Sequence, residues 1–202
     1  VFFPLGIICS YFVNLTCFVI ALITAILAIL YDSHMKKIKL LGNFYIAYVM
    51  AIPFIFGGAA VIESNTFSIS ITPSIFIIAL IAFLAGSGRE IMKDVQDFSG
   101  DLEKGVRSFP RYIGTYKSSI LAAIFYIIAI ILSFIPYIFE FFDIYYRNIY
   151  YICIIIITDV MLLITSLQLI TNKELDLKKY RKITLVAIFV GLVGFLIGAL
   201  MT

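Results

Sequence analysis

The sequence contains no tryptophan, a single histidine and few charged residues. His34 is the only histidine among its 202 residues, so a cluster of histidine metal ligands or a Ser-His-Asp triad cannot be built from them. The three cysteines, Cys9, Cys17 and Cys153, lie in apolar tracts without C-x-x-C spacing, which argues against a disulfide framework or a thiolate metal site. Charged residues make up 13% of the chain and hydrophobic residues 63%, which argues against an ordinary soluble protein.

The chain contains long apolar tracts. The mean hydropathy is +1.11, and each tract is close to the ~20 residues that a helix needs to cross a bilayer. The tracts are 17–31, 44–62, 73–88, 118–139, 149–170 and 183–201, with a shorter one at 1–13. We therefore predict an all-α polytopic membrane protein with about seven transmembrane segments, forming a single domain over 1–202.

The basic residues indicate the orientation of these segments. Fourteen of the 15 lie in the connections 32–43, 89–117 and 171–182, and Arg147 lies alone in another connection. Because connections rich in Lys and Arg stay in the cytoplasm, we expect these three on the cytoplasmic side. The net charge of +3 then serves topology and an anionic ligand or lipid headgroup. The sequence shows no nucleic-acid-binding signature.

The longest of these connections begins with an acidic segment. In a continuous helix Glu90, Asp94, Asp97 and Asp101, at spacings of 4, 3 and 4, would form one stripe. Like charges at this spacing repel one another, whereas a divalent cation requires converging carboxylates. The stripe therefore predicts a Mg²⁺ site. The alternative is a solvated acidic face, balanced by the neighbouring basic residues Arg89, Lys93 and Lys104.

A metal site ringed by basic residues at the end of a lipid-embedded bundle suits a substrate with a polyphosphate head and a hydrocarbon tail. Metal and basic residues would stabilise a departing diphosphate. Aromatic faces would stabilise a carbocation where water is excluded. Asp159 lies in the middle of an apolar tract. It either lines the same chamber or ties two helices together through hydrogen bonds.

The run from Arg89 to Asp101, followed by 105–110, resembles the second aspartate-rich motif of the UbiA-type intramembrane prenyltransferases. Residues 31–43, from Tyr31 to Asn43, resemble its Tyr/Lys segment and the Gly-Asn pair that opens the next helix. Segments 135–137 and 142–146 are similar to the archaeal ether-lipid branch of the family.

The resemblance implies a fold, an activity and a set of site residues. It implies a helical bundle around a cavity, and Mg²⁺-dependent transfer of a geranylgeranyl group from its diphosphate to geranylgeranylglyceryl phosphate, a lipid-like phosphate acceptor. By resemblance, Asp94, Asp97 and Asp101 bind metal, and Asp97, Asp101 and Tyr31 are the catalytic residues. The residues expected to bind substrate are Lys36, Asn43, Arg89, Lys93, Lys104 and Arg107.

The sequence departs from the family pattern in two places. The family's first motif, Asn-Asp-x-x-Asp-x-x-x-Asp, is absent from these residues, and the seven segments correspond to helices three to nine of nine. We therefore expect a chain that is incomplete at its amino terminus. Tyr31 and Lys36 are five residues apart rather than the commoner four, so Lys37 is the reserve phosphate ligand.

Three other functions are compatible with parts of the pattern. An aromatic acceptor, such as a quinone precursor, is an alternative to the lipid acceptor. Only the resemblance to the archaeal branch favours the lipid acceptor. A polytopic transporter would be favoured by inverted repeats, and we find no internal repeat. A CDP-alcohol phosphotransferase also uses an aspartate cluster, but its Asp-Gly-x-x-Ala-Arg segment is absent around Asp94.

Overall fold

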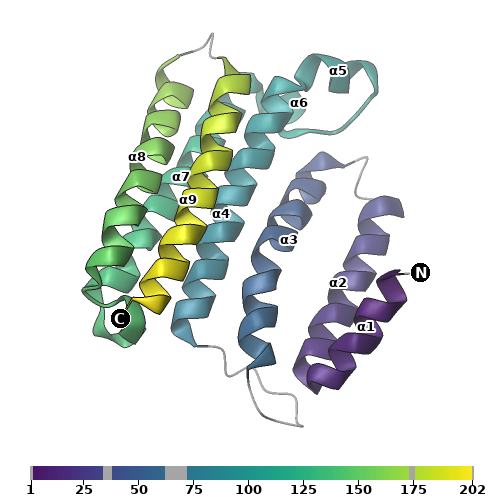
Figure 1. Ribbon diagram of the computed structural model, residues 1–202. Helices are drawn as coiled ribbons and strands as arrows, with labels where there is room; N and C mark the ends of the chain where they lie inside the picture. The colour runs from purple at the N-terminus through teal and green to yellow at the C-terminus, as the bar shows by residue number, and fades with distance from the viewer. Residues whose placement is uncertain (1, 34–37, 62–71, 173–175, 202) are drawn as a thin grey trace.

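The computed structural model describes residues 2–33, 38–61, 72–172 and 176–201, and all the regular elements within them are helices. Figure 1 shows the long helices side by side, with the short helices between residues 98 and 113 at one end of the bundle. The elements are α1 (Phe2–Val13), α2 (Leu15–Ser33), α3 (Lys39–Ala60), α4 (Pro73–Gln96), α5 (Phe98–Glu103), α6 (Phe109–Ile113), α7 (Thr115–Ile138), the 3₁₀ helix η2 (Glu140–Tyr145), α8 (Ile149–Thr171) and α9 (Leu177–Leu200).

The prediction of a polytopic helical membrane protein is confirmed. Among the described residues, six helices are long and apolar enough to span a membrane: α2, α3, α4, α7, α8 and α9. The seventh predicted segment is the shorter apolar helix α1. Large apolar side chains such as Ile26, Ile29 and Leu163 are exposed on the outside of the bundle, which suits a surface covered by lipid.

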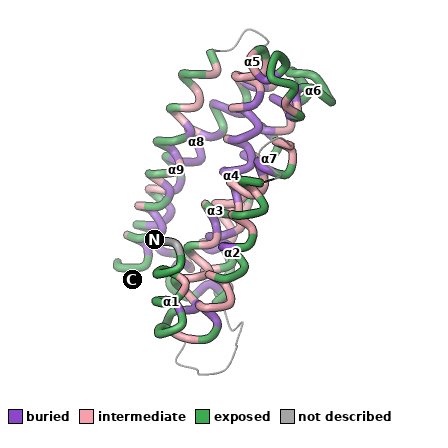
Figure 2. Tube along the Cα trace, turned by 90° about the vertical axis from the view of Figure 1, so that its right-hand side faces the viewer, coloured by how far each residue is buried: buried purple, intermediate pink, exposed green. Residues whose placement is uncertain are grey.

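Helix α4 is the central element of the fold. It packs against α3 on one side and against α7 and α9 on the other. Figure 2 shows the buried residues concentrated along α4 and the helices beside it, while α1 and α2 are mostly intermediate or exposed. Met92 and Ile91 of α4 are fully buried, in a cluster with Tyr126 of α7 and Leu169 of α8. The end of α4 is therefore held rigidly by its neighbours.

The helices alternate in direction, so that the three basic connections fall at the same end of the bundle. In Figure 1 the C-terminal ends of α2, α4 and α8 lie at the upper end, as do the N-terminal ends of α3, α7 and α9. The short helices α5 and α6 lie there too. The acidic segment is thus at the same end as most of the basic residues.

Close approach of α4 to α7 depends on a glycine. A Cβ atom at Gly88 would lie 3.0 Å from the backbone oxygen of Ala122 and 3.0 Å from Cε1 of Tyr126. Tyr126 is fully buried and cannot swing away. Small residues at such positions let membrane helices pack backbone to backbone.

We expect Gly88→Ala to destabilise the bundle, because the added methyl group would collide with a helix backbone. Overpacking of this kind costs about 1–3 kcal/mol, which should appear as a lower Tm in detergent. Gly57→Ala is the matched control, since Gly57 is an exposed helical glycine with no atom within 4 Å of its Cβ position. Equal melting temperatures for the two variants would contradict this packing.

Candidate active site

The central feature of the site is Asp94, which is held by two residues of α3. Its Oδ2 accepts a hydrogen bond of 2.7 Å from Nδ2 of Asn43, and its Oδ1 lies 3.3 Å from Nζ of Lys39. Asp94 is 1% exposed and Asn43 is buried. A carboxylate so far from water is tolerated only when its oxygens are paired, so α3 supplies the partners that α4 requires.

Asp101 reaches the same ammonium from the connection beyond α4. Its Oδ2 lies 2.7 Å from Nζ of Lys39. The turn that places Asp101 is a Schellman motif at the end of α5. The N–H of Val106 donates to the Asp101 carbonyl (3.0 Å) and that of Gly105 to the Leu102 carbonyl (3.1 Å). Gly105 has φ +68, a conformation that favours glycine.

The single acidic stripe expected from the sequence is wrong, because the helix does not continue through it. Helix α4 ends at Gln96, and Asp97 stands between α4 and α5 with φ −92 and ψ 6. In an unbroken helix Asp94 and Asp101 would be roughly 10 Å apart along the axis. The break at Asp97 instead lets both carboxylates contact one cation.

Glu90, the first acidic residue of the expected stripe, pairs with basic residues of its own helix. Its Oε1 lies 3.5 Å from Nη1 of Arg89, and its Oε2 lies 3.5 Å from Nζ of Lys93. Glu90 is therefore not joined to the cluster around Lys39. Of the other candidate substrate ligands, Lys104 and Arg107 are exposed in the connection after α5, and the backbone of Arg107 bridges to Ile38.

Tyr31 lies in a row of tyrosines between α2 and α3. Its ring stacks on that of Tyr45 with centroids 4.7 Å apart, and Tyr45 in turn stacks on Tyr48 at 6.4 Å. The hydroxyl of Tyr48 lies 2.8 Å from Oγ1 of Thr24. The candidate ligands Lys36 and Lys37, and His34, lie outside the described residues.

Phenylalanine rings gather around Phe44 of α3. Phe44 has its ring centroid 6.1 to 6.2 Å from those of Phe83, Phe109 and Phe125. These rings come from α3, α4, α6 and α7. A cluster of aromatic rings therefore surrounds Phe44, the residue that follows Asn43 in α3.

Lys39 is the site residue that the sequence analysis missed. It was counted only among the basic residues of a connection, whereas the structure places it between two carboxylates. A signal was available: Lys39 and Asn43 are four residues apart, and residues at that spacing share a helix face. Recognising the start of α3 at Lys39 would have put both side chains on the same face.

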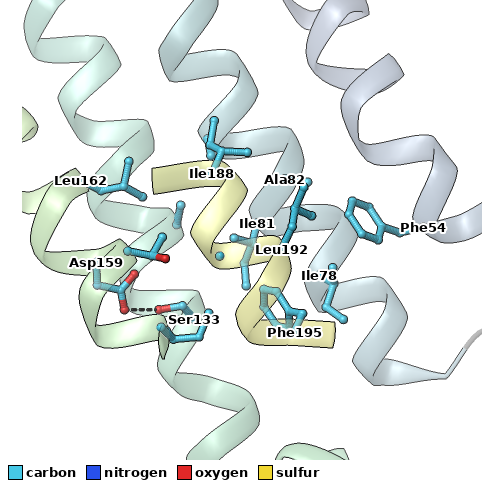
Figure 3. Close-up of a pocket in the computed structure, with 15 residues that line it drawn as sticks. Phe54, Ile78, Ile81, Ala82, Ser133, Asp159, Leu162, Ile188, Leu192 and Phe195 are labelled. Carbon is cyan, nitrogen blue, oxygen red and sulfur yellow. Dashed lines mark hydrogen bonds between the residues drawn. The ribbon is translucent and has the colours of Figure 1, made fainter. Parts of the chain in front are cut away.

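Asp159 lies in a separate cavity inside the bundle, shown in Figure 3. The cavity has a volume of about 50 Å³ and is lined mainly by apolar side chains, among them Phe54, Ile78 and Phe195. Oδ2 of Asp159 accepts a 2.7 Å hydrogen bond from Oγ of Ser133. Asp159 thus ties α8 to α7, which is the structural alternative considered for it, and its cavity contains none of the acidic cluster.

Comparison with known proteins identifies the family of this chain. The model of the UbiA prenyltransferase family matches residues 1–187. The chain belongs to the UbiA prenyltransferase family. It is 42% identical over 173 residues to the digeranylgeranylglyceryl phosphate synthase of Archaeoglobus fulgidus, an alignment that covers 84% of this chain and 55% of that protein. It is 39% identical over 198 residues to the synthase of the same name from Methanococcus maripaludis, covering 97% of this chain and 66% of that protein.

A solved structure agrees with these sequence relatives. A structure described as concerning the biosynthesis of digeranylgeranylglyceryl phosphate synthase in membranes superposes with a TM-score of 0.82 and 32% identity. It covers 99% of this chain and 67% of the other. The chain spans between about half and two thirds of the length of the curated relatives named above. The UbiA fold and the multi-pass membrane architecture predicted from the sequence are confirmed.

UbiA prenyltransferases generally use Mg²⁺ to bind diphosphate, and the donor atoms here suit that ion. Mg²⁺ prefers oxygen ligands and is commonly held by one or two carboxylates together with substrate phosphates. Asp94 and Asp101 already converge on one cation, the Lys39 ammonium. In the described part of the chain, no group of three acidic, histidine or cysteine side chains is placed to hold a metal. The part of Asp97 in metal binding therefore stays a prediction.

We expect the hydrogen bond from Asn43 to Asp94 to contribute measurably to stability, because both groups are buried. A hydrogen bond to a charged group contributes about 1.5–3 kcal/mol. The measurement is a double-mutant cycle of Asn43→Ala and Asp94→Ala, read as unfolding free energy in detergent. Costs that simply add in the double variant would show that the two side chains are not coupled.

Proposed function

We propose that this protein transfers a geranylgeranyl group from geranylgeranyl diphosphate to the free hydroxyl of geranylgeranylglyceryl phosphate. The product carries the second ether bond of archaeal membrane lipid. Two observations support the proposal: the 42% and 39% identity to synthases of that name, and the convergence of Asp94 and Asp101 on Lys39 at the end of a membrane bundle.

The reaction exchanges one carbon–oxygen bond for another. The bond between C1 of the prenyl chain and the diphosphate breaks, and C1 bonds to the hydroxyl oxygen of the acceptor, whose proton is released. Negative charge grows on the departing diphosphate, and positive charge grows on C1. The protein must stabilise both charges where water is excluded.

We assign Asp94 and Asp101, with Asp97 between them in the chain, to Mg²⁺ at the diphosphate. When bound, the ion would neutralise the charge of the leaving group. We assign Lys39, which contacts both Asp94 and Asp101, to a phosphate oxygen of the diphosphate, in the role first expected of Lys36. Phe44 and the rings around it supply apolar aromatic surface for the prenyl chain.

The position of the site in the membrane follows from the charge asymmetry. The basic connections and the acidic cluster share one end of the bundle, and the excess of Lys and Arg predicts that this end is cytoplasmic. The site then faces the compartment that supplies phosphorylated substrates, while the hydrocarbon chains lie between the helices.

We expect Asp97→Asn and Asp101→Asn each to reduce prenyl transfer a hundredfold or more, because each removes a carboxylate charge from the diphosphate site. A hundredfold loss corresponds to about 3 kcal/mol of transition-state stabilisation. The measurement is transfer of radiolabelled geranylgeranyl groups by the whole protein in membranes.

Glu103→Gln is the matched control for this assay. Glu103 is an exposed carboxylate at the end of α5, in the same connection, and the change removes the same charge. Its activity should stay within about twofold of wild type. Near-normal activity of Asp97→Asn and Asp101→Asn together would exclude the proposed metal role of these residues.

A further inference from the structure

A basic pocket lies between α4 and α9, on the opposite side of α4 from the acidic cluster. Its volume is about 290 Å³. It is lined by Arg89, Gln96, Lys178, Arg181, Lys182 and Leu185. Four of these six side chains are cations, and none is a carboxylate. A pocket with this lining repels metal ions and attracts anions.

Two facing helical stripes form the pocket. On α9 the lining residues stand at positions 178, 181, 182 and 185, a spacing that places side chains on one face. On α4, Arg89 and Gln96 are seven residues apart and also share a face. At about 100° per residue, Arg89 and Gln96 point roughly 140° and 160° away from Asp94. Helix α4 therefore separates this pocket from the carboxylates that contact Lys39.

The two arginines of the pocket lack acceptors for part of their donors. Among the described residues, the Nε atoms of Arg89 and Arg181 are buried without a hydrogen-bond partner. Nη1 of Arg89 lies 3.5 Å from Oε1 of Glu90, and Nη1 of Arg181 donates a 2.8 Å hydrogen bond to the neutral Oε1 of Gln96. A buried donor without an acceptor destabilises a fold, so an external group that supplies acceptor oxygens would bind favourably here.

The lysines add positive charge at the rim of the pocket. Lys178 and Lys182 line it and are exposed. In the part of the chain that the structure describes, no carboxylate lies within salt-bridge distance of Lys178, Arg181 or Lys182. The Asp176 side chain, at the start of α9, accepts hydrogen bonds from backbone N–H groups of that helix. The pocket therefore has surplus positive charge both inside and at its mouth.

An exposed apolar stripe of α9 continues from the pocket. Leu185 lines the pocket, and Phe189, Leu192 and Leu196 follow it at spacings of 4, 3 and 4. All four side chains are exposed. From Leu185 to Leu196 the stripe extends about 16 Å along the helix axis, which is close to half the thickness of the hydrocarbon core of a bilayer. The pocket itself lies at the end of the bundle where α9 begins and α4 ends (Figure 1).

Cations at the end of a membrane helix, followed by an apolar stripe as deep as one leaflet, match the two parts of a lipid molecule. We propose that this pocket binds the phosphate of an anionic bilayer lipid, with a hydrocarbon chain of the lipid lying along the stripe on α9. A phosphodiester offers two unesterified oxygens, and arginine side chains bind such oxygens through strong charge-assisted hydrogen bonds. Basic pockets between transmembrane helices are known to bind anionic headgroups.

The bound lipid takes no part in prenyl transfer, because α4 lies between the pocket and Asp94. Its phosphate instead joins α4 to α9 beside Gln96, the last residue of α4. The expected effect is therefore on the stability of the folded protein, which is measured without any substrate. The inference does not depend on the proposed function.

The first measurement is the Tm of the whole protein in a non-ionic detergent, with and without dioleoyl phosphatidylglycerol. A ligand that binds only the folded state raises Tm, by roughly 5 °C at a hundredfold excess over its Kd. Arg181→Gln and Lys182→Gln should each lose at least half of that rise. Lys182→Gln should also fold normally, because Lys182 is exposed and forms no salt bridge within the described residues. An unchanged lipid-induced rise in both variants would overturn the proposal.

Lys179→Gln is the matched control. Lys179 is an exposed cation on the same helix that does not line the pocket, and its Nζ lies over the ring of Tyr180. The change removes the same charge, and the variant should keep the full lipid-induced rise of Tm. Arg181→Lys, which keeps the charge but not the planar donor group, should retain part of the rise. An equal loss in Lys179→Gln would reduce the effect to general surface charge and refute a specific pocket.

Two further probes distinguish a bilayer lipid from other ligands. Glycerophosphoglycerol, the same headgroup without hydrocarbon chains, should leave Tm unchanged because it has nothing to place on the apolar stripe. Dioleoyl phosphatidylcholine, with the same chains but no net charge, should raise Tm much less than phosphatidylglycerol does. Full stabilisation by glycerophosphoglycerol would identify a site for free phosphate compounds. Full stabilisation by phosphatidylcholine would identify a site for hydrocarbon chains alone, and either result would overturn the assignment to an anionic lipid.

Discussion

The placement of Lys39 between Asp94 and Asp101 is the interaction on which the site depends. Two carboxylates with 1% and 8% exposure could not face each other without a cation, because neither can be solvated by water. The ammonium holds the start of α3, the end of α4 and the α5 turn together. Removing only the ammonium, or only the carboxylates, from such a buried group leaves the remaining charge without a partner.

The rest of the fold fixes the geometry of that contact. Helix α4 is clamped between α3, α7 and α9, and Gly88 allows its backbone to approach α7 closely. Because α4 is held along its length, charges placed on different faces of its last turns stay separated. One face carries Asp94 toward α3, and another carries Arg89 and Gln96 toward α9. A single rigid helix thereby divides two charged pockets.

The helices themselves could be predicted almost completely from the sequence. Each apolar tract became a helix, because backbone groups in a bilayer must satisfy their hydrogen bonds within the segment. The acidic segment was also found, since charge is rare elsewhere in the chain. The prediction failed at Asp97, where a periodic pattern was extended through a helix break. The contact of Asp101 with Lys39 is made beyond that break, and it is not visible in helical periodicity.

Local chemistry determined which parts of this chain lie in the membrane, which end collects positive charge and where carboxylates cluster. Those properties depend on hydropathy and spacing, which are readable over about 20 consecutive residues. Which polar side chains pair with one another depends on the tertiary structure. Lys39 and Asp101 are 62 residues apart, and Gln96 and Arg181 are 85 apart. Such pairs form because helix packing brings distant faces together, and the packing is set by the shapes of many side chains at once.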